Sequence, residues 1–61
     1  MTKQVKFEVY KSKSTGYRWR LVAGNGEIVA TSEGYTTIQA AINGAYRVRE
    51  IASQAMILTQ E

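Results

Sequence analysis

One segment of the sequence has residue types that could bind a nucleic acid. Tyr17-Arg18-Trp19-Arg20 places aromatic rings beside arginines, and further lysines occur at positions 3, 6, 11 and 13. Aromatic rings can stack on unpaired bases while arginines and lysines contact phosphates. The residues that would form this surface are Lys6, Tyr10, Arg18 and Arg20. Weak binding of single-stranded nucleic acid is therefore the main alternative function.

The alternation of side chains along a strand argues against nucleic-acid binding. Successive residues of a strand point to opposite faces, so Trp19 points away from Arg18 and Arg20. An indole packed under a helix cannot stack on a base while these arginines reach phosphates. The net charge of +3 is also small for a dedicated nucleic-acid module. We therefore do not expect specific nucleic-acid binding.

Catalytic and metal chemistry have few candidate residues. The 61 residues include no His, no Cys and no Asp. A serine nucleophile needs an adjacent base, and Ser12 and Ser14 lie in a polar segment without one. Glu8 and Glu33 could form a carboxylate pair, but each is expected to face an arginine. Transition metals prefer His and Cys, and Ca²⁺ needs clustered carboxylates. We predict no enzymatic activity, no catalytic residue, no cofactor and no metal.

Alternation and turn residues predict a three-stranded antiparallel meander. Apolar and polar residues alternate over residues 5–10, 17–23 and 27–33. Residues 12–16 form a polar loop, and Asn25-Gly26 is typical of a type I′ hairpin turn, which needs positive φ at both positions. The two turns predict these apolar pairs: Val9 with Trp19, Phe7 with Leu21, Leu21 with Ala30, and Trp19 with Ser32. They also predict two ion pairs on the polar face: Glu8 with Arg20, and Glu33 with Arg18.

A helix is expected after the third strand, with Thr36 or Thr37 as its N-cap. Apolar residues recur at spacings of three and four, which predicts one apolar stripe packed on the sheet and on Trp19. The stripe contains Ile38, Ala41, Ile42, Ala45, Val48 and Ala52. Gly44 lies inside the helix, where glycine costs about 1 kcal/mol relative to alanine. A close contact with the backbone at Gly44 would explain its presence.

The last apolar segment predicts a fourth strand over Ala55–Thr59. Met56, Ile57 and Leu58 would be apolar on both faces, whereas a strand with one wet face alternates. A chain of this size buries only about 60% of its unfolded surface, and it has no cysteine to form a disulfide. We therefore expect a homodimer with Met56, Ile57 and Leu58 in its interface.

The quoted residues together resemble the YegP-like family, a bacterial family of small domains of unknown function. The similarity lies in Phe7–Lys11, Tyr17–Leu21, Asn25–Tyr35 and Asn43-Gly44, within a stretch from about Phe7 to Ala52. It implies two β-β-β-α-β units that share one sheet and exchange their C-terminal strands. Ile38 and Ile42 depart from the family pattern, which often has polar residues there. The resemblance implies no activity, no cofactor and no catalytic residue.

We therefore expect a single α+β domain over residues 1–61 that acts as a homodimeric interaction or structural module. A scaffold that works through an unidentified protein partner is a third possibility. Residues 1–6 lack the apolar region of a signal peptide, and the longest apolar run, residues 55–58, is too short to cross a bilayer. The expected location is the cytoplasm, without a membrane partner.

Overall fold

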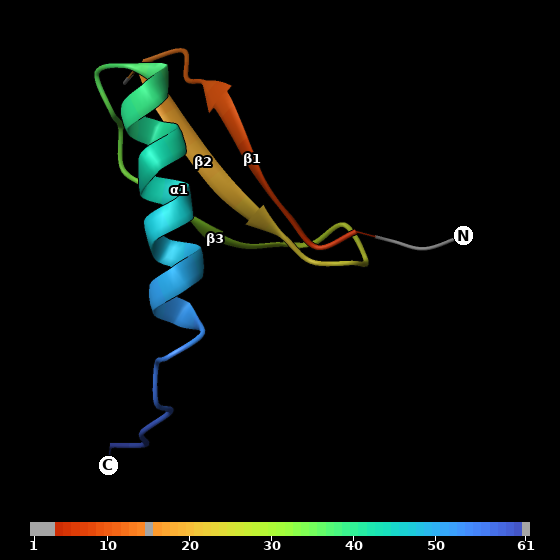
Figure 1. The fold of residues 1–61 in the computed structure, drawn as a ribbon. Helices are drawn as coiled ribbons and strands as arrows, with labels where there is room; N and C mark the ends of the chain where they lie inside the picture. The colour runs from red at the N-terminus through yellow and green to blue at the C-terminus, as the bar shows by residue number, and fades with distance from the viewer. Residues whose placement is uncertain (1–3, 15, 61) are drawn as a thin grey trace.

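A computed structural model describes residues 4–14 and 16–60 of the chain. Its elements are β1 (Lys6–Lys11), β2 (Tyr17–Val22), β3 (Ile28–Thr31) and α1 (Ile38–Ala52). The strands form an antiparallel sheet in the order β1-β2-β3, and α1 packs against β1 and β2 on one face (Figure 1). The predicted α+β meander with one helix is confirmed. Within the described ranges, no helix has the length and apolar character needed to cross a membrane.

The register between β1 and β2 is the predicted one. Val9 pairs with Trp19, Phe7 with Leu21, and Glu8 with Arg20. At the end of this hairpin the Ser12 N–H donates to the Gly16 carbonyl oxygen at 2.6 Å. Gly16 has a φ of +79°, which is a conformation that glycine adopts with little strain. The polar loop therefore closes where the alternation of the two strands requires.

The hairpin between β2 and β3 differs from the predicted type I′ turn. The Gly26 N–H donates to the Ala23 carbonyl at 2.9 Å, and the Ala23 N–H donates to the Glu27 carbonyl at 2.8 Å. The loop thus contains residues 24–26, one residue more than expected. Within the turn only Gly26 has a positive φ, +89°, so the type I′ prediction is wrong. The Asn25 side-chain oxygen instead accepts from the Glu27 N–H at 3.0 Å, which stabilises Asn25 in an ordinary turn conformation.

A bulge in β3 compensates for the longer turn. Val22 pairs with Ile28, but the next pair is Leu21 with Ala30, so Val29 is the extra residue. The predicted pair of Leu21 and Ala30 is therefore confirmed, although the turn that predicted it is wrong. Beyond β3, the Ser32 N–H donates to the Trp19 carbonyl at 2.9 Å, as expected for opposite residues. The Trp19 N–H donates in return to the Ser32 hydroxyl at 2.9 Å.

The helix begins after one of the two predicted N-cap residues and ends at Ala52, the last residue of the predicted stripe. Thr37 is the N-cap, and its hydroxyl accepts from the Ala40 N–H at 3.1 Å. Ala41 is fully buried and Ala45 is 7% exposed, whereas Ile38 at the start of the predicted stripe is 50% exposed. Ala52 at the other end of the stripe is exposed as well, so the stripe is covered at its centre and open at both ends.

Trp19 is the largest core side chain and is only 6% exposed. The Phe7 ring meets the Trp19 ring edge-on, with centroids 5.2 Å apart and an interplanar angle of 78°. A Cβ atom on Gly44 would collide with the Tyr35 hydroxyl and lie 3.4 Å from Trp19 Nε1. Tyr35 and Trp19 thus make the close contact that the position of Gly44 predicted.

Val22 departs from the simple alternation. Its position in the strand assigned it to the polar face with Arg18 and Arg20, yet it is only 7% exposed. Val22 lies in the central strand and has Lys6 and Ile28 as its pairing partners on either side. Flanking strands on both sides bury a small side chain even on a face that lacks a helix.

The predicted fourth strand is absent from the single chain. Residues 55–60 form neither strand nor helix, and Met56, Ile57 and Leu58 are 80%, 95% and 71% exposed. The prediction of a strand over Ala55–Thr59 with both faces covered is therefore wrong for the isolated chain. The physical reason is that a strand needs a neighbouring strand for its backbone groups, and this segment lies beside none.

Candidate interaction surfaces

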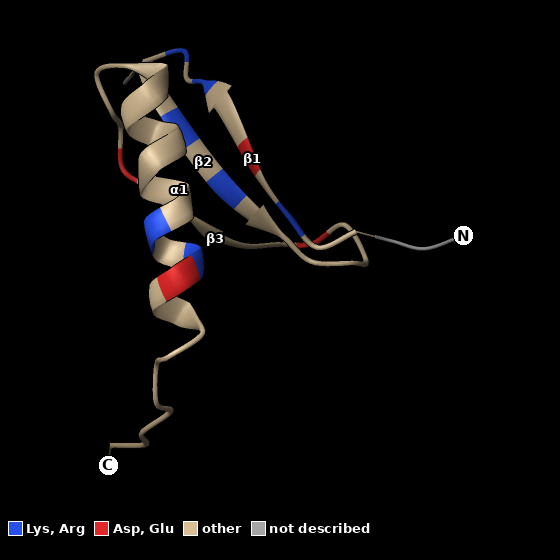
Figure 2. Cartoon of the chain, in the orientation of Figure 1, with Lys and Arg blue, Asp and Glu red and all other residues tan. Residues whose placement is uncertain are grey.

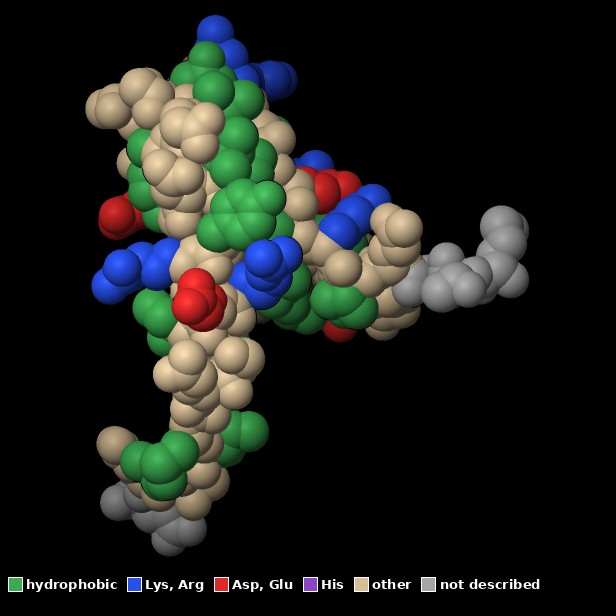
Figure 3. Space-filling model, in the orientation of Figure 1, with side chains coloured by type: hydrophobic (Ala, Val, Ile, Leu, Met, Phe, Trp, Pro, Cys, Tyr) green, Lys and Arg blue, Asp and Glu red, His purple; other side chains and the backbone are tan. Residues whose placement is uncertain are grey.

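The C-terminal segment, residues 55–60, leaves the body of the molecule after α1. The last backbone hydrogen bond that links it to the helix runs from the Ala55 N–H to the Ala52 carbonyl at 3.2 Å. Beyond this point the segment extends away from the sheet, and its apolar side chains stand apart from the body (Figure 3). Three consecutive apolar residues, Met56, Ile57 and Leu58, are thereby exposed to water. Such a run is typical of a surface that another element covers.

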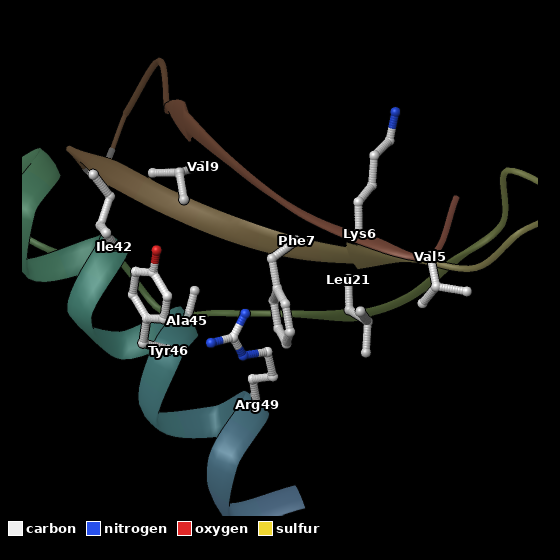
Figure 4. A pocket seen from close by; sticks show the side chains of 9 residues that line it. All are labelled: Val5, Lys6, Phe7, Val9, Leu21, Ile42, Ala45, Tyr46 and Arg49. Carbon is white, nitrogen blue, oxygen red and sulfur yellow. The ribbon is translucent and has the colours of Figure 1, made fainter. Parts of the chain in front are cut away.

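A groove of about 460 Å³ lies between β1 and α1 (Figure 4). Phe7 and Leu21 point from the sheet toward the helix, whereas the Lys6 side chain points away from it. Most lining side chains are apolar, so the groove is suited to an apolar occupant. The lining residues are Val5, Lys6, Phe7, Val9, Leu21, Ile42, Ala45, Tyr46 and Arg49.

The helix wall of the groove was not predicted as a site. Ile42, Tyr46 and Arg49 line it at spacings of four and three, which places them on one side of the helix. The Arg49 guanidinium lies 4.8 Å from the centroid of the Tyr46 ring. The predicted apolar stripe includes Ile42 but neither Tyr46 nor Arg49, so only their spacing of four and three from Ile42 signals this wall in the sequence.

The opposite face of the sheet bears the polar side chains of the nucleic-acid alternative. We call it the outer face; basic and acidic positions lie side by side there on β1 and β2 (Figure 2). The Arg20 Nε–H donates to Glu8 Oε1 at 2.8 Å, and Lys6 Nζ lies 3.2 Å from Glu8 Oε2. The predicted pair of Glu8 and Arg20 is therefore confirmed, with Lys6 as an additional partner.

The contacts on the outer face occupy its basic groups. The Arg20 guanidinium, followed by the Lys6 ammonium, lowers the pKa of Glu8 from its ordinary value. Arg20 also lies 4.7 Å from the centroid of the Tyr10 ring, so it covers one face of that ring. Arg18 pairs with Tyr10 across the strands. The second predicted ion pair, Glu33 with Arg18, is not among those formed by the described residues.

The residues considered for catalysis are not assembled around a cavity. Glu8 is engaged with Arg20 and Lys6 on the outer face, and Ser14 donates its backbone N–H to the Ser12 hydroxyl at 3.3 Å in the loop. The lining residues of the groove include neither a carboxylate nor a Ser or Thr hydroxyl. The described groove therefore contains no pair of nucleophile and carboxylate base.

Comparison with known proteins places the chain in a family. Residues 12–58 match the family described as a domain of unknown function, DUF1508. The chain belongs to this family. A UPF0339 protein of Treponema denticola is 43% identical over 53 residues, which cover 87% of this chain and 91% of that protein. The UPF0339 protein YegP of Escherichia coli O157:H7 is 44% identical over 48 residues, so the YegP-like resemblance is confirmed.

The DUF1508 comparisons also bear on size and fold. The match to YegP covers 79% of this chain but only 44% of YegP, which has room for a second unit of similar length. A protein from Haloferax volcanii, whose solution structure was determined by NMR, superposes with a TM-score of 0.79 at 37% identity. This superposition covers 95% of this chain and 98% of the other. The family match extends to residue 58 and so includes Met56, Ile57 and Leu58.

Proposed function

We propose that this DUF1508 protein is a non-catalytic interaction module that acts in the cytoplasm as a homodimer with exchanged C-terminal segments. The observation that supports the proposal is the exposure of Met56, Ile57 and Leu58, at 80%, 95% and 71%. Burial of a large apolar side chain stabilises a protein by about 1.5–3 kcal/mol. For a chain this small, three such residues are a large part of the available stabilisation.

The C-terminal segment of a single chain cannot bury its own apolar side chains. Its three apolar residues are adjacent, so in an extended conformation they point to both sides. A second copy offers a self-complementary solution, because each chain brings one exposed segment and one open groove. The small size and the absence of cysteine in the sequence favour the same arrangement.

Light scattering coupled to size exclusion tests the proposal at micromolar concentration. The full chain should give twice the mass of one chain. The triple variant Met56→Ser, Ile57→Ser, Leu58→Ser should be monomeric, because it removes the apolar side chains that the dimer would bury. A matched control that changes polar neighbours, Gln54→Ser with Gln60→Ser, should remain dimeric. A monomeric parent chain would contradict the proposal.

The contacts on the outer face disfavour nucleic-acid binding as the function. Glu8 pairs with both Lys6 and Arg20 and offsets one of their two positive charges, and Arg20 covers one face of the Tyr10 ring. We expect no binding of a fluorescent single-stranded oligonucleotide at physiological salt, measured by anisotropy. Glu8→Gln should produce weak binding at low salt that declines steeply as salt rises. Tight binding by the parent chain would replace the proposed function with this alternative.

A further inference from the structure

β3 is the most exposed strand of the sheet and forms one of its two edges. All four of its residues are exposed, and Ile28 and Val29 are 51% and 56% exposed. The helix packs on β1 and β2 and not on β3. β3 is therefore open at its outer edge and on both faces, although its residues are apolar except for Thr31.

Two glutamates bracket this strand. Glu27 directly precedes Ile28, and Glu33 follows Thr31 by two residues. Neither carboxylate forms an ion pair with a described residue. Figure 2 shows acidic positions at both ends of β3 and no basic position along it, whereas β1 and β2 both contain basic residues. Residues 27–33, which we call the β3 surface, are thus an acidic and apolar part of a chain whose net charge is +3.

The backbone of Thr31 offers hydrogen bonds at this edge. The Ser32 N–H donates to the Trp19 carbonyl at 2.9 Å, so Trp19 bonds toward β3. In an antiparallel ladder, hydrogen-bonded pairs alternate with pairs whose backbone groups face away from each other. Thr31 pairs with Arg20, the residue after Trp19, and therefore directs its N–H and C=O to the open side. An extended segment beside β3 can bond these two groups.

The two glutamates disfavour pairing between two copies of the β3 surface. In an antiparallel pair of identical strands, the start of one strand lies beside the end of the other. Glu27 of each copy would then lie near Glu33 of the other, and like charges opposite each other destabilise a sheet. The bulge at Val29 also hinders edge-to-edge pairing. The β3 surface is therefore poorly suited to a second copy of itself.

We propose that the β3 surface binds a short extended segment of another protein, apolar at its centre and with Lys or Arg at both ends. Its cations would lie near Glu27 and Glu33, and its apolar side chains would cover Ile28 and Val29. The same charges that repel a second copy would attract this partner, which is how an interface gains specificity. The inference rests on the proposed role as an interaction module and specifies the partner's chemistry. It does not depend on how the chain dimerises.

Protection against aggregation alone does not explain this combination of residues. Edge strands are commonly protected by charged side chains on the strand itself, lysine above all. β3 has no charged residue, and its exposed apolar side chains remain available to another strand. The charges lie at its two ends instead, where they select the ends of an incoming segment. The four residues of β3 limit that segment to a short one.

Fluorescence anisotropy with two labelled, end-capped heptapeptides tests the charge match on the full chain. Both peptides alternate threonine and valine, and one has lysine at both ends where the other has glutamate. The lysine peptide should bind on the order of 10-fold more tightly, because two attractive pairs replace two repulsive ones. Attraction to the net charge of +3 alone would favour the glutamate peptide. Equal binding, a preference for glutamate, or no binding would overturn the proposal.

Substitution of the glutamates tests whether the β3 surface is responsible for the preference. The double variant Glu27→Gln, Glu33→Gln should bind the lysine peptide no more tightly than the glutamate peptide. Glu50→Gln is the matched control, because it removes an exposed carboxylate from the helix. It should keep the preference for lysine. A double variant that keeps the preference would overturn the assigned site.

Hydrogen exchange followed by NMR tests whether the peptide pairs with the edge. Addition of the lysine peptide should slow exchange of the Thr31 amide on the order of 10-fold, because the added strand bonds it. The Ser32 amide already bonds Trp19 and is the internal control. Thr31→Pro should abolish peptide binding and keep the fold, since proline is tolerated where an edge N–H faces solvent. Unchanged exchange at Thr31 in the saturated parent chain would overturn the proposal, whether or not Thr31→Pro folds.

Light scattering on the same samples separates this inference from the proposed dimer. A dimer that does not prefer the lysine peptide would refute the role of the β3 surface and retain the dimer. A monomer that prefers the lysine peptide would refute the dimer and support the role of the β3 surface. A mass above that of a dimer without peptide, which Thr31→Pro abolishes, would identify a second copy as the occupant and overturn the proposal.

Discussion

The side chain of Tyr35 occupies the space that a Cβ atom on Gly44 would need. Such an atom would collide with the Tyr35 hydroxyl, lie 2.9 Å from Cζ of the same ring and lie 3.4 Å from Trp19 Nε1. Tyr35 is held in place by two backbone hydrogen bonds with Tyr17, at 2.9 and 2.7 Å. These bonds hold the backbone of Tyr35, so a Cβ atom on Gly44 could be accommodated only by rotation of the Tyr35 side chain or by a shift of the helix.

Gly44→Ala should destabilise the fold, although alanine is the better helix former by about 1 kcal/mol. The collision with Tyr35 forces the ring or the helix to shift, which costs about 1–3 kcal/mol. Tyr35→Phe combined with Gly44→Ala should recover part of the loss, because the colliding hydroxyl is gone. Thermal unfolding measures all three variants. A higher melting temperature for Gly44→Ala alone would show that the contact exerts no strain.

Trp19→Ala should lower the free energy of unfolding by roughly 3–5 kcal/mol, since the indole is 6% exposed and packs edge-on against Phe7. Trp19→Phe should cost less, because it keeps an aromatic ring. It also removes the buried Nε1–H, which has no hydrogen-bond partner among the described residues. Urea unfolding of the two variants provides the comparison. If the two variants lost the same free energy of unfolding, a smaller aromatic ring at this position would contribute nothing to stability.

Gly16→Ala and Gly26→Ala form a matched pair at two positive-φ glycines, with φ of +79° and +89°. Both substitutions impose the backbone strain of a left-handed alanine, about 1–2 kcal/mol. Only at Gly16 would the new Cβ also collide with a backbone group, the Tyr35 carbonyl; at Gly26 nothing lies within 4 Å. Gly16→Ala should therefore be clearly the less stable variant in thermal unfolding. Similar melting temperatures would contradict the contact with Tyr35.

The Glu8 carboxyl should titrate below its ordinary range, because Arg20 and then Lys6 lower its pKa. A lowered pKa in the folded state means that this interaction stabilises the fold above the unfolded pKa of about 4.3 and is lost as pH falls through the lower folded value. NMR titration of the carboxyl measures the shift. Arg20→Gln should raise the pKa of Glu8 more than Lys6→Gln does. The opposite order would identify Lys6 as the principal partner.

Local patterns in the sequence determined most of the sheet and the helix. The alternation around Trp19 assigned it to the buried face, and Thr37 with the spacing of Ala41 and Ala45 predicted the helix and its N-cap. These predictions succeeded because side-chain periods of two and of 3.6 are set by backbone geometry, and the apolar side of each must be covered. Glu8 and Arg20 met as predicted because the register of one hairpin was sufficient to place them.

Other features were decided only by the tertiary structure. Asn25-Gly26 could form either of two turns, and the bulge at Val29 restored the register that the longer turn would have displaced. The groove depends on how α1 crosses β1, which no local pattern specifies. Gly44 indicated a close contact, but Tyr35 was identified as its partner only in three dimensions. Chain neighbours fix the period of an element, whereas the packing angle and the contacts between distant residues arise from the whole fold.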